Sequence, residues 1–328
     1  MNNTEISFFK KYKPNVIEDF LFNDDLEKIL YFFLETNELN MFIHGASGCG
    51  KTSIIRVLIN HYYDLNELTS HEKNEILQKN VFYINSLSEY GINFFRNEVK
   101  TFCKIPSFLT NKKKIVVIDD IDNINEQSQQ VLRNYISEYK HNIFFMASCT
   151  NIQKIISNLQ SRLNIISIPH MTNEKLKIHA EKIIKNENLV IDEESKNFLL
   201  KISNYSLRIL ITYLEKIYLL DEPINIKICK NICTNIDYSI LSDYTCEIFE
   251  KRNIENAIYI IKSIFEKGYS AIDIFETYFL YVKNTTILNE GLKYNIIKTI
   301  TKYISYFYTK HEDEIELYLF TNDIYNLI

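Results

Sequence analysis

The stretch Gly45-Ala46-Ser47-Gly48-Cys49-Gly50-Lys51-Thr52 fits the pattern G-x-x-x-x-G-K-[ST] at every fixed position. An apolar run over 41–43 precedes it and a helical pattern over 53–61 follows it, which is the strand–loop–helix context of a phosphate-binding loop. Three of the chain's six glycines lie in this loop, where they let the backbone approach a polyphosphate closely. The sequence therefore predicts a nucleotide-binding loop, in preference to a glycine-rich turn that matches by chance.

The residue types of this loop predict how it would bind a nucleotide. Backbone N–H groups and the N-terminus of the following helix supply donors and partial positive charge for the phosphates. Lys51 is expected to reach the β- and γ-phosphates, and the hydroxyl of Thr52 is expected to ligate Mg²⁺.

A second stretch supplies carboxylates for the same site. The β-branched run Ile115-Val116-Val117-Ile118 is followed directly by Asp119 and Asp120. This pattern predicts a buried parallel strand whose acids lie at the carboxyl edge of the sheet, where a magnesium nucleotide would bind. The alternative, a solvated strand end, is disfavoured by the phosphate-binding loop upstream.

Alternating strand and helix patterns extend over residues 1–170 and predict one α/β domain with a largely parallel sheet. From Thr172 onward the hydrophobic period is helical throughout, which places a domain boundary near residue 170. We expect a small helical bundle over 171–235. A second all-helical domain is expected over 236–328, with surplus apolar surface available to sibling subunits.

Several connecting segments have weaker patterns. Pro14 is incompatible with a helix interior, so residues 8–23 are expected to be extended. Residues 64–80 are polar and are expected to form a surface connection. Residues 92–103 predict a helix with Arg96 and Lys100 on one face.

Composition excludes several classes of function. The net charge of −5 over 328 residues argues against a generally basic nucleic-acid coat protein, although a local basic surface remains compatible with it. No apolar run approaches the roughly 20 residues of a membrane span, and the N-terminus lacks a signal-peptide pattern, so we expect a protein of the nucleus or cytoplasm. The six cysteines show no zinc spacing and are expected to be reduced structural thiols.

Six further short motifs follow one another along the chain: Lys11-Tyr12-Lys13-Pro14, Gly91-Ile92-Asn93 with Arg96 and Lys100, Gln129-Gln130-Val131-Leu132-Arg133, Gln160-Ser161-Arg162, Ser206-Leu207-Arg208 and Gly268-Tyr269-Ser270-Ala271. Together with the segments above, they resemble the small subunits of replication factor C, the AAA+ clamp loader, over nearly the whole chain. In that family the first motif and the last four read E-K-Y-R-P, Q-Q-A-L-R, Q-S-R-C, G-D-M-R and G-Y-S-A. The resemblance implies an AAA+ P-loop domain over 1–170, a helical lid over 171–235 and a helical collar for oligomerisation over 236–328.

The resemblance implies a set of ATP-binding residues. Phe9 and Leu21 would flank the adenine, and Thr150 would be sensor 1, which reads the γ-phosphate. Asp119 would hold Mg²⁺ through water, and Asp120 would polarise the attacking water. The phosphates would lie on the loop and the first residues of its helix, namely Gly45, Ala46, Ser47, Gly48, Cys49, Gly50, Lys51, Thr52 and Ser53.

Other implied roles connect the nucleotide to partners. Arg208 would be the sensor-2 arginine of the lid, and Arg162 an arginine finger that acts on the ATP of a neighbouring subunit. Asn85 would be a polar switch that holds the catalytic acid away until DNA binds. The implied DNA-phosphate contacts are Arg96, Lys100 and Arg133. Without the resemblance, Arg162 and Arg208 would be read equally well as ordinary surface residues. The alternative for Arg96, Lys100 and Arg133 is that they are solvated helix positions.

Four positions depart from the family pattern. Asp120 stands where the family has Glu in D-E-A-D, so its carboxylate is one methylene shorter, and Thr150 stands where sensor 1 is usually Asn. Leu163 replaces a Cys, and Lys13 replaces an Arg. A displacement of about 1 Å can cost about 10²-fold in rate, so hydrolysis is affected more than binding.

Two functions are therefore expected as alternatives. In the first, the chain is an ATP-hydrolysing clamp-loader subunit that assembles with homologous subunits into a pentamer, opens a ring-shaped sliding clamp and binds primer-template DNA. In the second, it binds nucleotide without hydrolysing it and supplies Arg162 to a neighbour. A third possibility, an origin-licensing ATPase or a branch-migration helicase, is disfavoured because the helical tail has no recognisable winged-helix pattern.

Overall fold

The computed structural model describes residues 7–85, 91–220, 224–233, 236, 238–285, 287–309 and 312–327. The chain forms two compact units. The first runs to Ile178 and includes Tyr205–Ile211, and the second comprises His179–Asn204 and the chain from Thr212 onward. The division into domains 1–170, 171–235 and 236–328 remains a prediction.

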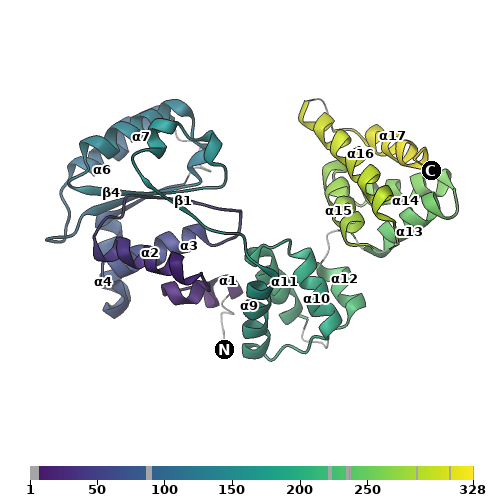
Figure 1. Cartoon of the computed structure of the whole chain (residues 1–328), viewed down its shortest axis with the longest axis horizontal. Helices are drawn as coiled ribbons and strands as arrows, with labels where there is room; N and C mark the ends of the chain where they lie inside the picture. Colours follow the sequence, from purple (N-terminus) through teal and green to yellow (C-terminus); the bar gives the residue numbers. More distant parts are fainter. Residues whose placement is uncertain are drawn as a thin grey trace. The chain divides into compact units, whose positions relative to one another are not determined.

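The first unit is built on a five-stranded parallel sheet, as the sequence predicted (Figure 1). The strand order is β2-β3-β4-β1-β5, so the strand that enters the phosphate-binding loop lies between β4 and β5. Strands β3 and β4 are almost wholly apolar because both faces of the sheet are covered. The strands are β1 (Met41–His44), β2 (Val81–Asn85), β3 (Lys114–Asp119), β4 (Ile143–Cys149) and β5 (Asn164–Ser167).

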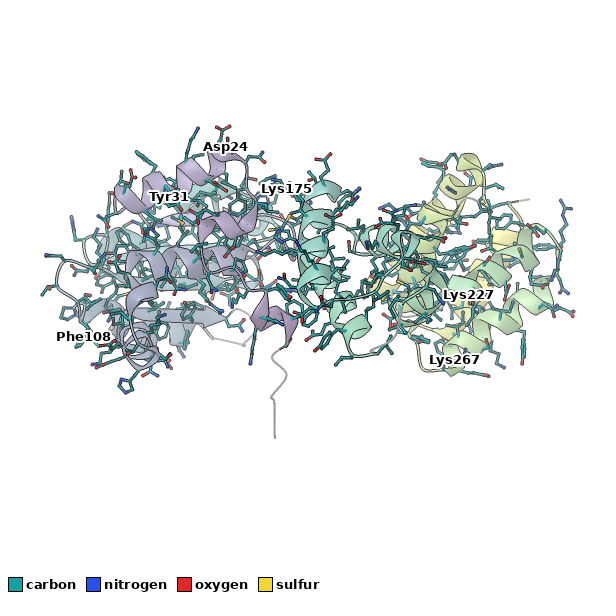
Figure 2. All side chains as sticks on the ribbon, turned by 90° about the horizontal axis from the view of Figure 1, so that it is seen from below. Asp24, Tyr31, Phe108, Lys175, Lys227 and Lys267 are labelled. Carbon is teal, nitrogen blue, oxygen red and sulfur yellow. The ribbon has the colours of Figure 1, made fainter. Side chains whose placement is uncertain are left out.

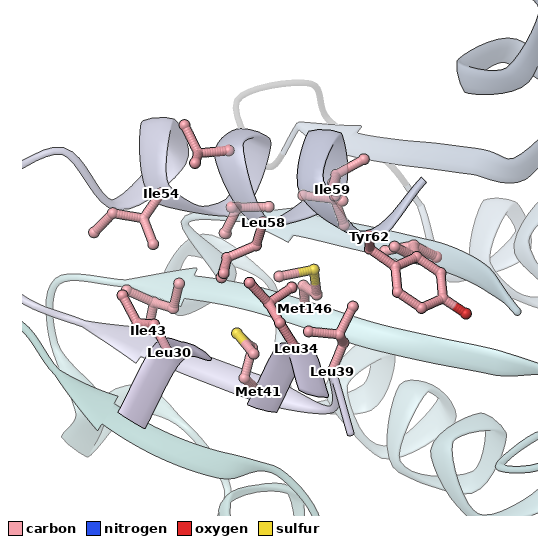
Figure 3. Close-up of a cluster of buried hydrophobic side chains, with 14 of the residues drawn as sticks. Leu30, Leu34, Leu39, Met41, Ile43, Ile54, Leu58, Ile59, Tyr62 and Met146 are labelled. Carbon is pink, nitrogen blue, oxygen red and sulfur yellow. The ribbon is translucent and has the colours of Figure 1, made fainter. Parts of the chain in front are cut away.

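Two hydrophobic clusters cover the two faces of this sheet. On one face, Met146 of β4 packs with Ile54 and Leu58 of α3 (Lys51–Tyr62) in a cluster that also includes side chains of α2 (Asp24–Glu35) (Figure 3). On the other face, Phe145 packs in a cluster with Leu132 of α7 (Glu126–Glu138). The two clusters fix the phosphate-binding helix α3 on one side of the sheet and α7 on the opposite side (Figure 1).

Two connecting segments differ from the sequence-based expectation. Residues 8–23 contain the short helix α1 (Phe8–Lys11) and the 3-10 turn η1 (Ile17–Phe20), so only the part around Pro14 is extended. Residues 64–80 contain a helix, α4 (Ser70–Asn80), where a surface connection was predicted. A capping box explains this helix, because the Glu72 carboxylate accepts the N–H of Thr69 at 2.9 Å.

The predicted helix over 92–103 is present but irregular. It consists of α5 (Ile92–Phe94), a π-helical turn η3 (Phe95–Val99) and α6 (Lys100–Lys104). Phe108, which follows it, is half exposed, and Nζ of Lys79 on α4 lies 3.9 Å from the centre of its ring (Figure 2). The remaining short elements of this unit are η2 (Leu65–Glu67), η4 (Ile121–Asn123), η5 (Ile152–Lys154) and α8 (Ser157–Gln160).

The described part of the second unit is helical, apart from one parallel bridge between Ile191 and Ile224. Its last five helices pack together around aromatic side chains, with Phe275 against Phe320 and Tyr303. Among the described residues, none of the helices has the length and apolar character needed to cross a membrane. The helices from residue 173 onward are α9 (Asn173–Asn186), α10 (Glu193–Ile202), α11 (Leu207–Tyr218), α12 (Ile226–Cys233), α13 (Tyr238–Phe249), α14 (Ile254–Glu266), α15 (Ala271–Asn284), α16 (Glu290–Thr309) and α17 (Glu314–Tyr325).

Candidate nucleotide-binding site

The loop between β1 and α3 has the backbone conformation that its glycines predict. Gly48 and Gly50 have φ values of +76° and +99°, in the left-handed region that favours glycine. Gly45 N–H donates to the carbonyl of Cys149 at 3.3 Å, which joins the start of the loop to the end of β4. The loop therefore begins at the carboxyl edge of the sheet and ends in the first turn of α3.

Lys51 is the cation of this loop. Its side chain is only 7% exposed, and Nζ donates to the carbonyls of Gly45 and Ala46, each at 3.0 Å. No carboxylate pairs with this ammonium group within the described part of the chain. Neutral carbonyls rather than a carboxylate therefore hold this side chain in the loop, where it can bind an anion.

The Asp119 carboxylate connects β3 to the P-loop helix. The hydroxyl of Thr52 donates to Oδ1 and Oδ2 of Asp119 at 3.0 and 2.9 Å. The hydroxyl of Ser148 on β4 also donates to Oδ1. Hydroxyl and carboxylate oxygens are hard donors, so this set fits Mg²⁺, which binds few protein ligands together with substrate phosphates. Bound Mg²⁺ would neutralise phosphate charge here.

Asp120 follows Asp119 in an unusual backbone conformation. Its φ is +51°, and its N–H donates to Oγ of Ser148 at 3.0 Å. Burial and the neighbouring charge of Asp119 raise the pKa of the Asp120 carboxyl, while the cations of Lys51 and Arg208 oppose this increase. A carboxylate with a raised pKa accepts a proton more readily than an ordinary one.

Asp122 holds the segment that follows β4. Its Oδ2 accepts the N–H of Thr150 at 3.2 Å, the hydroxyl of Thr150 at 2.6 Å and the N–H of Asn151 at 3.0 Å. Burial alone would raise the pKa of Asp122, but these hydrogen bonds outweigh it and lower the pKa. The other oxygen, Oδ1, is buried with no partner among the described residues.

The start of α11 lies against the phosphate-binding loop within the first unit. A Cβ added to Gly48 would lie 2.4 Å from Oγ of Ser206 and 3.5 Å from Cβ of Arg208. The charge of Arg208 is close enough to act on the pKa of Asp120. The structure therefore places Arg208, the predicted sensor-2 arginine, beside the loop. This proximity cannot be seen from the sequence, where the two are more than 150 residues apart.

The aromatic side chain of Phe20 lies against the loop. Its ring lies 3.4 Å from the position of a Cβ on Gly50 and stacks on Phe22. The residues predicted to flank the adenine lie on the same lead-in segment: Phe9 on α1 is 40% exposed, and Leu21 follows η1 with φ +51°. The remaining loop residues comprise the buried Cys49, the exposed Ser47 and the half-buried Ala46 and Ser53.

Two predicted residues lie outside the loop itself. Asn85 is the last residue of β2 and lies directly beside Asp119 in the sheet register. Arg162 follows α8 and is exposed; its Nε donates to Oγ of Ser137 at 2.9 Å, and its Nη1 donates to the carbonyl of Asn158 at 2.5 Å. No carboxylate within the described ranges pairs with this guanidinium.

The three predicted DNA contacts come from two helical segments that pack together. Buried Phe95 belongs to the same hydrophobic cluster as Leu132 of α7, and this packing leaves Arg96 exposed. Lys100 begins α6 and is half-buried. Arg133 lies on α7 with its Nε buried and unpartnered within the described chain.

Sequence reasoning missed three residues of this site: Ser148, Asp122 and Phe20. Ser148 offers one signal in retrospect, since it is a lone hydroxyl near the end of an apolar strand. Asp122 offers another as the third acid of Asp119-Asp120-Ile121-Asp122. The contact of Ser148 with Asp119 and that of Asp122 with Thr150 depend on the order of the strands, which cannot be read from the sequence.

Two protein families match the chain. The ATPase family associated with various cellular activities (AAA) matches residues 41–169, which span the sheet from β1 to β5. The replication factor C C-terminal domain matches residues 240–305, within the helices α13 to α16. The two matches follow one another in the order expected from the resemblance.

Several curated relatives match nearly the whole chain. A replication factor C small-subunit homologue of Acanthamoeba polyphaga mimivirus is 27% identical over 90% of this chain and 89% of its own length. Replication factor C subunit 4 of Saccharomyces cerevisiae is 26% identical over 90% of this chain and 88% of its own. The replication factor C small subunit of Thermoplasma acidophilum is 27% identical over 89% and 88%.

The fold is also similar to solved AAA+ structures. The Thermotoga maritima RuvB Holliday junction branch migration motor superposes with a TM-score of 0.53 over 87% of this chain and 98% of that one. At 15% identity, this likeness concerns the fold alone. The family matches and the full-length relatives agree with the P-loop geometry: the chain combines an AAA domain with a replication factor C C-terminal domain, and its full-length relatives are replication factor C small subunits.

Proposed function

We propose that this chain is a clamp-loader subunit that uses ATP and Mg²⁺ to open a ring-shaped sliding clamp and load it onto primer-template DNA during replication. The observation that carries the proposal is the convergence of Lys51, Thr52 and Asp119 at one edge of the sheet. The match to the replication factor C C-terminal domain and the replication factor C relatives support clamp loading as the process that ATP would drive.

In this proposal, the phosphates of ATP lie on residues 45–53. Lys51 exchanges its carbonyl partners for β- and γ-phosphate oxygens, and Thr52 with Asp119 holds Mg²⁺. Asp120 orients the attacking water and accepts its proton, a role that its raised pKa favours. Arg208 stabilises negative charge on the γ-phosphate from the other side of the loop.

Assembly would control this reaction. Arg162 has no carboxylate partner among the described residues and is held by neutral acceptors, which supports a role as an arginine finger on a neighbouring subunit's ATP. Such a finger can contribute about 10³–10⁵ in rate, so hydrolysis would depend on the complete ring. Residues 236–328 would form the collar of a pentamer with homologous subunits, and residues 171–235 the lid.

DNA would bind through charged side chains of η3, α6 and α7. Arg96, Lys100 and Arg133 would contact the phosphates of primer-template DNA, so affinity would fall with salt and show little sequence preference. Asn85 borders Asp119 in the sheet, which supports a switch that holds the catalytic acid away until DNA binds. The proposed DNA contacts and the proposed switch favour a protein that acts at a replication site, in the nucleus or the cytoplasm.

A second function is favoured by two observations. Asp120 is one methylene shorter than the family glutamate, and the hydroxyl of Thr150 already donates to Asp122. The chain could therefore bind ATP as a structural subunit without hydrolysing it, while supplying Arg162 to a neighbour.

The first experiment is native mass measurement of the chain co-expressed with the sliding clamp and paralogues of its own genome, with and without ATP. We expect a five-subunit assembly that retains the clamp only with ATP, and a Lys51→Ala variant that does not retain it. A hexamer, or a monomer indifferent to clamp and nucleotide, would contradict the proposal.

A second experiment separates the two functions. ATP turnover is measured in the assembled complex with wild-type chain and with Asp120→Ala. A fall in turnover means that this subunit hydrolyses ATP. Unchanged turnover, with ATP still bound, means that this subunit has the structural function instead.

A further inference from the structure

Ser148 is a polar residue in an apolar environment. It lies on β4, between β3 and β1, and its side chain is fully buried. Side chains on a strand alternate between faces, so Ser148 shares its face with Phe144 and Met146, which pack in the cluster beneath α3 (Figure 3). A buried hydroxyl is destabilising unless it is hydrogen-bonded, so its contacts carry the argument.

The Ser148 hydroxyl makes two hydrogen bonds, and both involve acids of the candidate site. It donates to Oδ1 of Asp119, and its oxygen accepts the N–H of Asp120 at 3.0 Å. One side chain thus fixes both the carboxylate of the first acid and the backbone of the second. The second contact matters because Asp120 has a φ of +51°, a conformation that costs energy for a residue with a Cβ.

Thr52 also bonds Asp119, but in a different setting. Thr52 is exposed at the start of α3, in the loop that a nucleotide would contact, whereas Ser148 is fixed within the sheet. The hydrogen bond from Ser148 is therefore the one that a bound nucleotide leaves in place. Hydrogen bonds of this kind orient metal-ligating carboxylates, and their loss typically costs about 10–100-fold in metal affinity or activity.

We propose that Ser148 is a positioning residue that orients the Asp119 carboxylate for Mg²⁺ and fixes the backbone turn from which Asp120 extends. The proposal rests on the proposed function, because it assumes that the loop binds a magnesium nucleotide. It adds a buried residue of β4 to the residues assigned to the site.

The test uses the full chain with Ser148→Ala and a fluorescent ATP analogue, titrated first in EDTA and then with increasing Mg²⁺. Ser128→Ala is the matched control, because the Ser128 side chain is also fully buried while its hydroxyl has no hydrogen-bond partner among the described residues. We expect Ser148→Ala to weaken the apparent Mg²⁺ affinity by about 10-fold or more, with metal-free affinity within about twofold of wild type.

Each outcome separates orientation from packing. If Ser148 has only a structural role, Ser148→Ala would lower the thermal midpoint, or would weaken binding as much without Mg²⁺ as with it. The Mg²⁺ dependence of Ser148→Ala would then match that of Ser128→Ala. This result would overturn the proposal. If Ser148→Ala does not fold, Ser148→Cys fills the site with a slightly larger side chain and weakens the donor, and it should still reduce the Mg²⁺ affinity.

The failure of the proposed function would look different. A wild-type chain that binds the analogue neither with nor without Mg²⁺ would overturn both proposals. If the wild-type chain binds the analogue with Mg²⁺, and this binding is lost in Lys51→Ala but unchanged in Ser148→Ala, only the proposed role of Ser148 is overturned.

Discussion

The hydroxyl of Thr150 donates a 2.6 Å hydrogen bond to Oδ2 of Asp122, which also accepts the N–H groups of Thr150 and Asn151. The side chain proposed to read the γ-phosphate is therefore already bonded within its own chain. Contact with a phosphate would require Thr150 to exchange this partner, so Asp122 opposes the proposed sensor role while it orders the segment after β4.

Substitution of Asp122 should make this contribution measurable. Asp122→Asn replaces an acceptor of three hydrogen bonds with a neutral amide, and we expect the free energy of unfolding at pH 7 to fall by about 1–3 kcal/mol. Urea unfolding measures the change. Asp243→Asn, at an exposed position, is the control and should have little effect.

The pH dependence of Asp122→Asn follows from the lowered pKa. Because the folded pKa of Asp122 lies below its ordinary value of 3.8, the stability from the ionised group is complete above the unfolded pKa and is lost as pH falls through the folded pKa. The gap between wild type and Asp122→Asn should therefore narrow between pH 7 and pH 3. An equal gap at both pH values would show that ionisation of Asp122 is not the cause.

Lengthening Asp120 should test whether its reach limits hydrolysis. In the assembled complex, Asp120→Glu is expected to raise ATP turnover by up to about 10²-fold, because the longer carboxylate approaches the attacking water more closely. Asp120→Asn has the same size as wild type but cannot accept the proton, and should reduce turnover. Turnover that is equal in Asp120→Glu and wild type would mean that reach is not limiting.

Lys114 should stabilise the segment that bears Arg96 and Lys100. Its side chain is 2% exposed, and Nζ donates to the carbonyls of Phe102 and Ile105 at 3.0 and 3.2 Å. Lys114→Met keeps the apolar stem but leaves both carbonyls without this donor, so we expect a loss of about 1–3 kcal/mol in urea unfolding. Lys298→Met, at an exposed position, is the control. If Lys114→Met is as stable as wild type, Lys114 does not stabilise this segment.

Charge reversal of Arg96 and Lys100 should change the salt dependence of DNA binding. Each lost phosphate contact lowers the slope of log affinity against log salt by about 0.7–0.9, so the double variant should flatten it by about 1.4–1.8. Fluorescence anisotropy with primer-template DNA measures the slope. Lys267→Glu with Lys298→Glu introduces the same charge elsewhere on exposed positions. If both pairs change the slope equally, Arg96 and Lys100 are not specific contacts.

Local patterns predicted much of the fold. The loop 45–52 was specified by a contiguous motif, and the apolar runs ending at Asp119 and Cys149 identified two central strands. The capping box at Thr69 and Glu72 was also local, but the polar composition around it predicted a surface connection without identifying the helix that forms it. The sequence therefore predicted those elements whose structure is determined by residues adjacent in the chain.

Contacts across the sheet could not be predicted in this way. Ser148 meets Asp119 because β4 pairs with β3, and the order β2-β3-β4-β1-β5 places that strand between the two acids and the P-loop strand. Phe20 lies beside Gly50 of the loop because η1 packs near α3. Both contacts arise from tertiary packing between segments that are distant in sequence.

The neutral partners of Arg162 have a kinetic consequence. Ser137 and the carbonyl of Asn158 fix the direction of the guanidinium without cancelling its charge, so its field extends from the exposed surface into solvent. A positive field of this kind accelerates the encounter with an anionic surface, and mobile ions screen it beyond about 10 Å at 0.1 M salt. If the proposed ring forms, Arg162 would therefore speed the encounter with a neighbour's nucleotide most at low salt, before any chemical step.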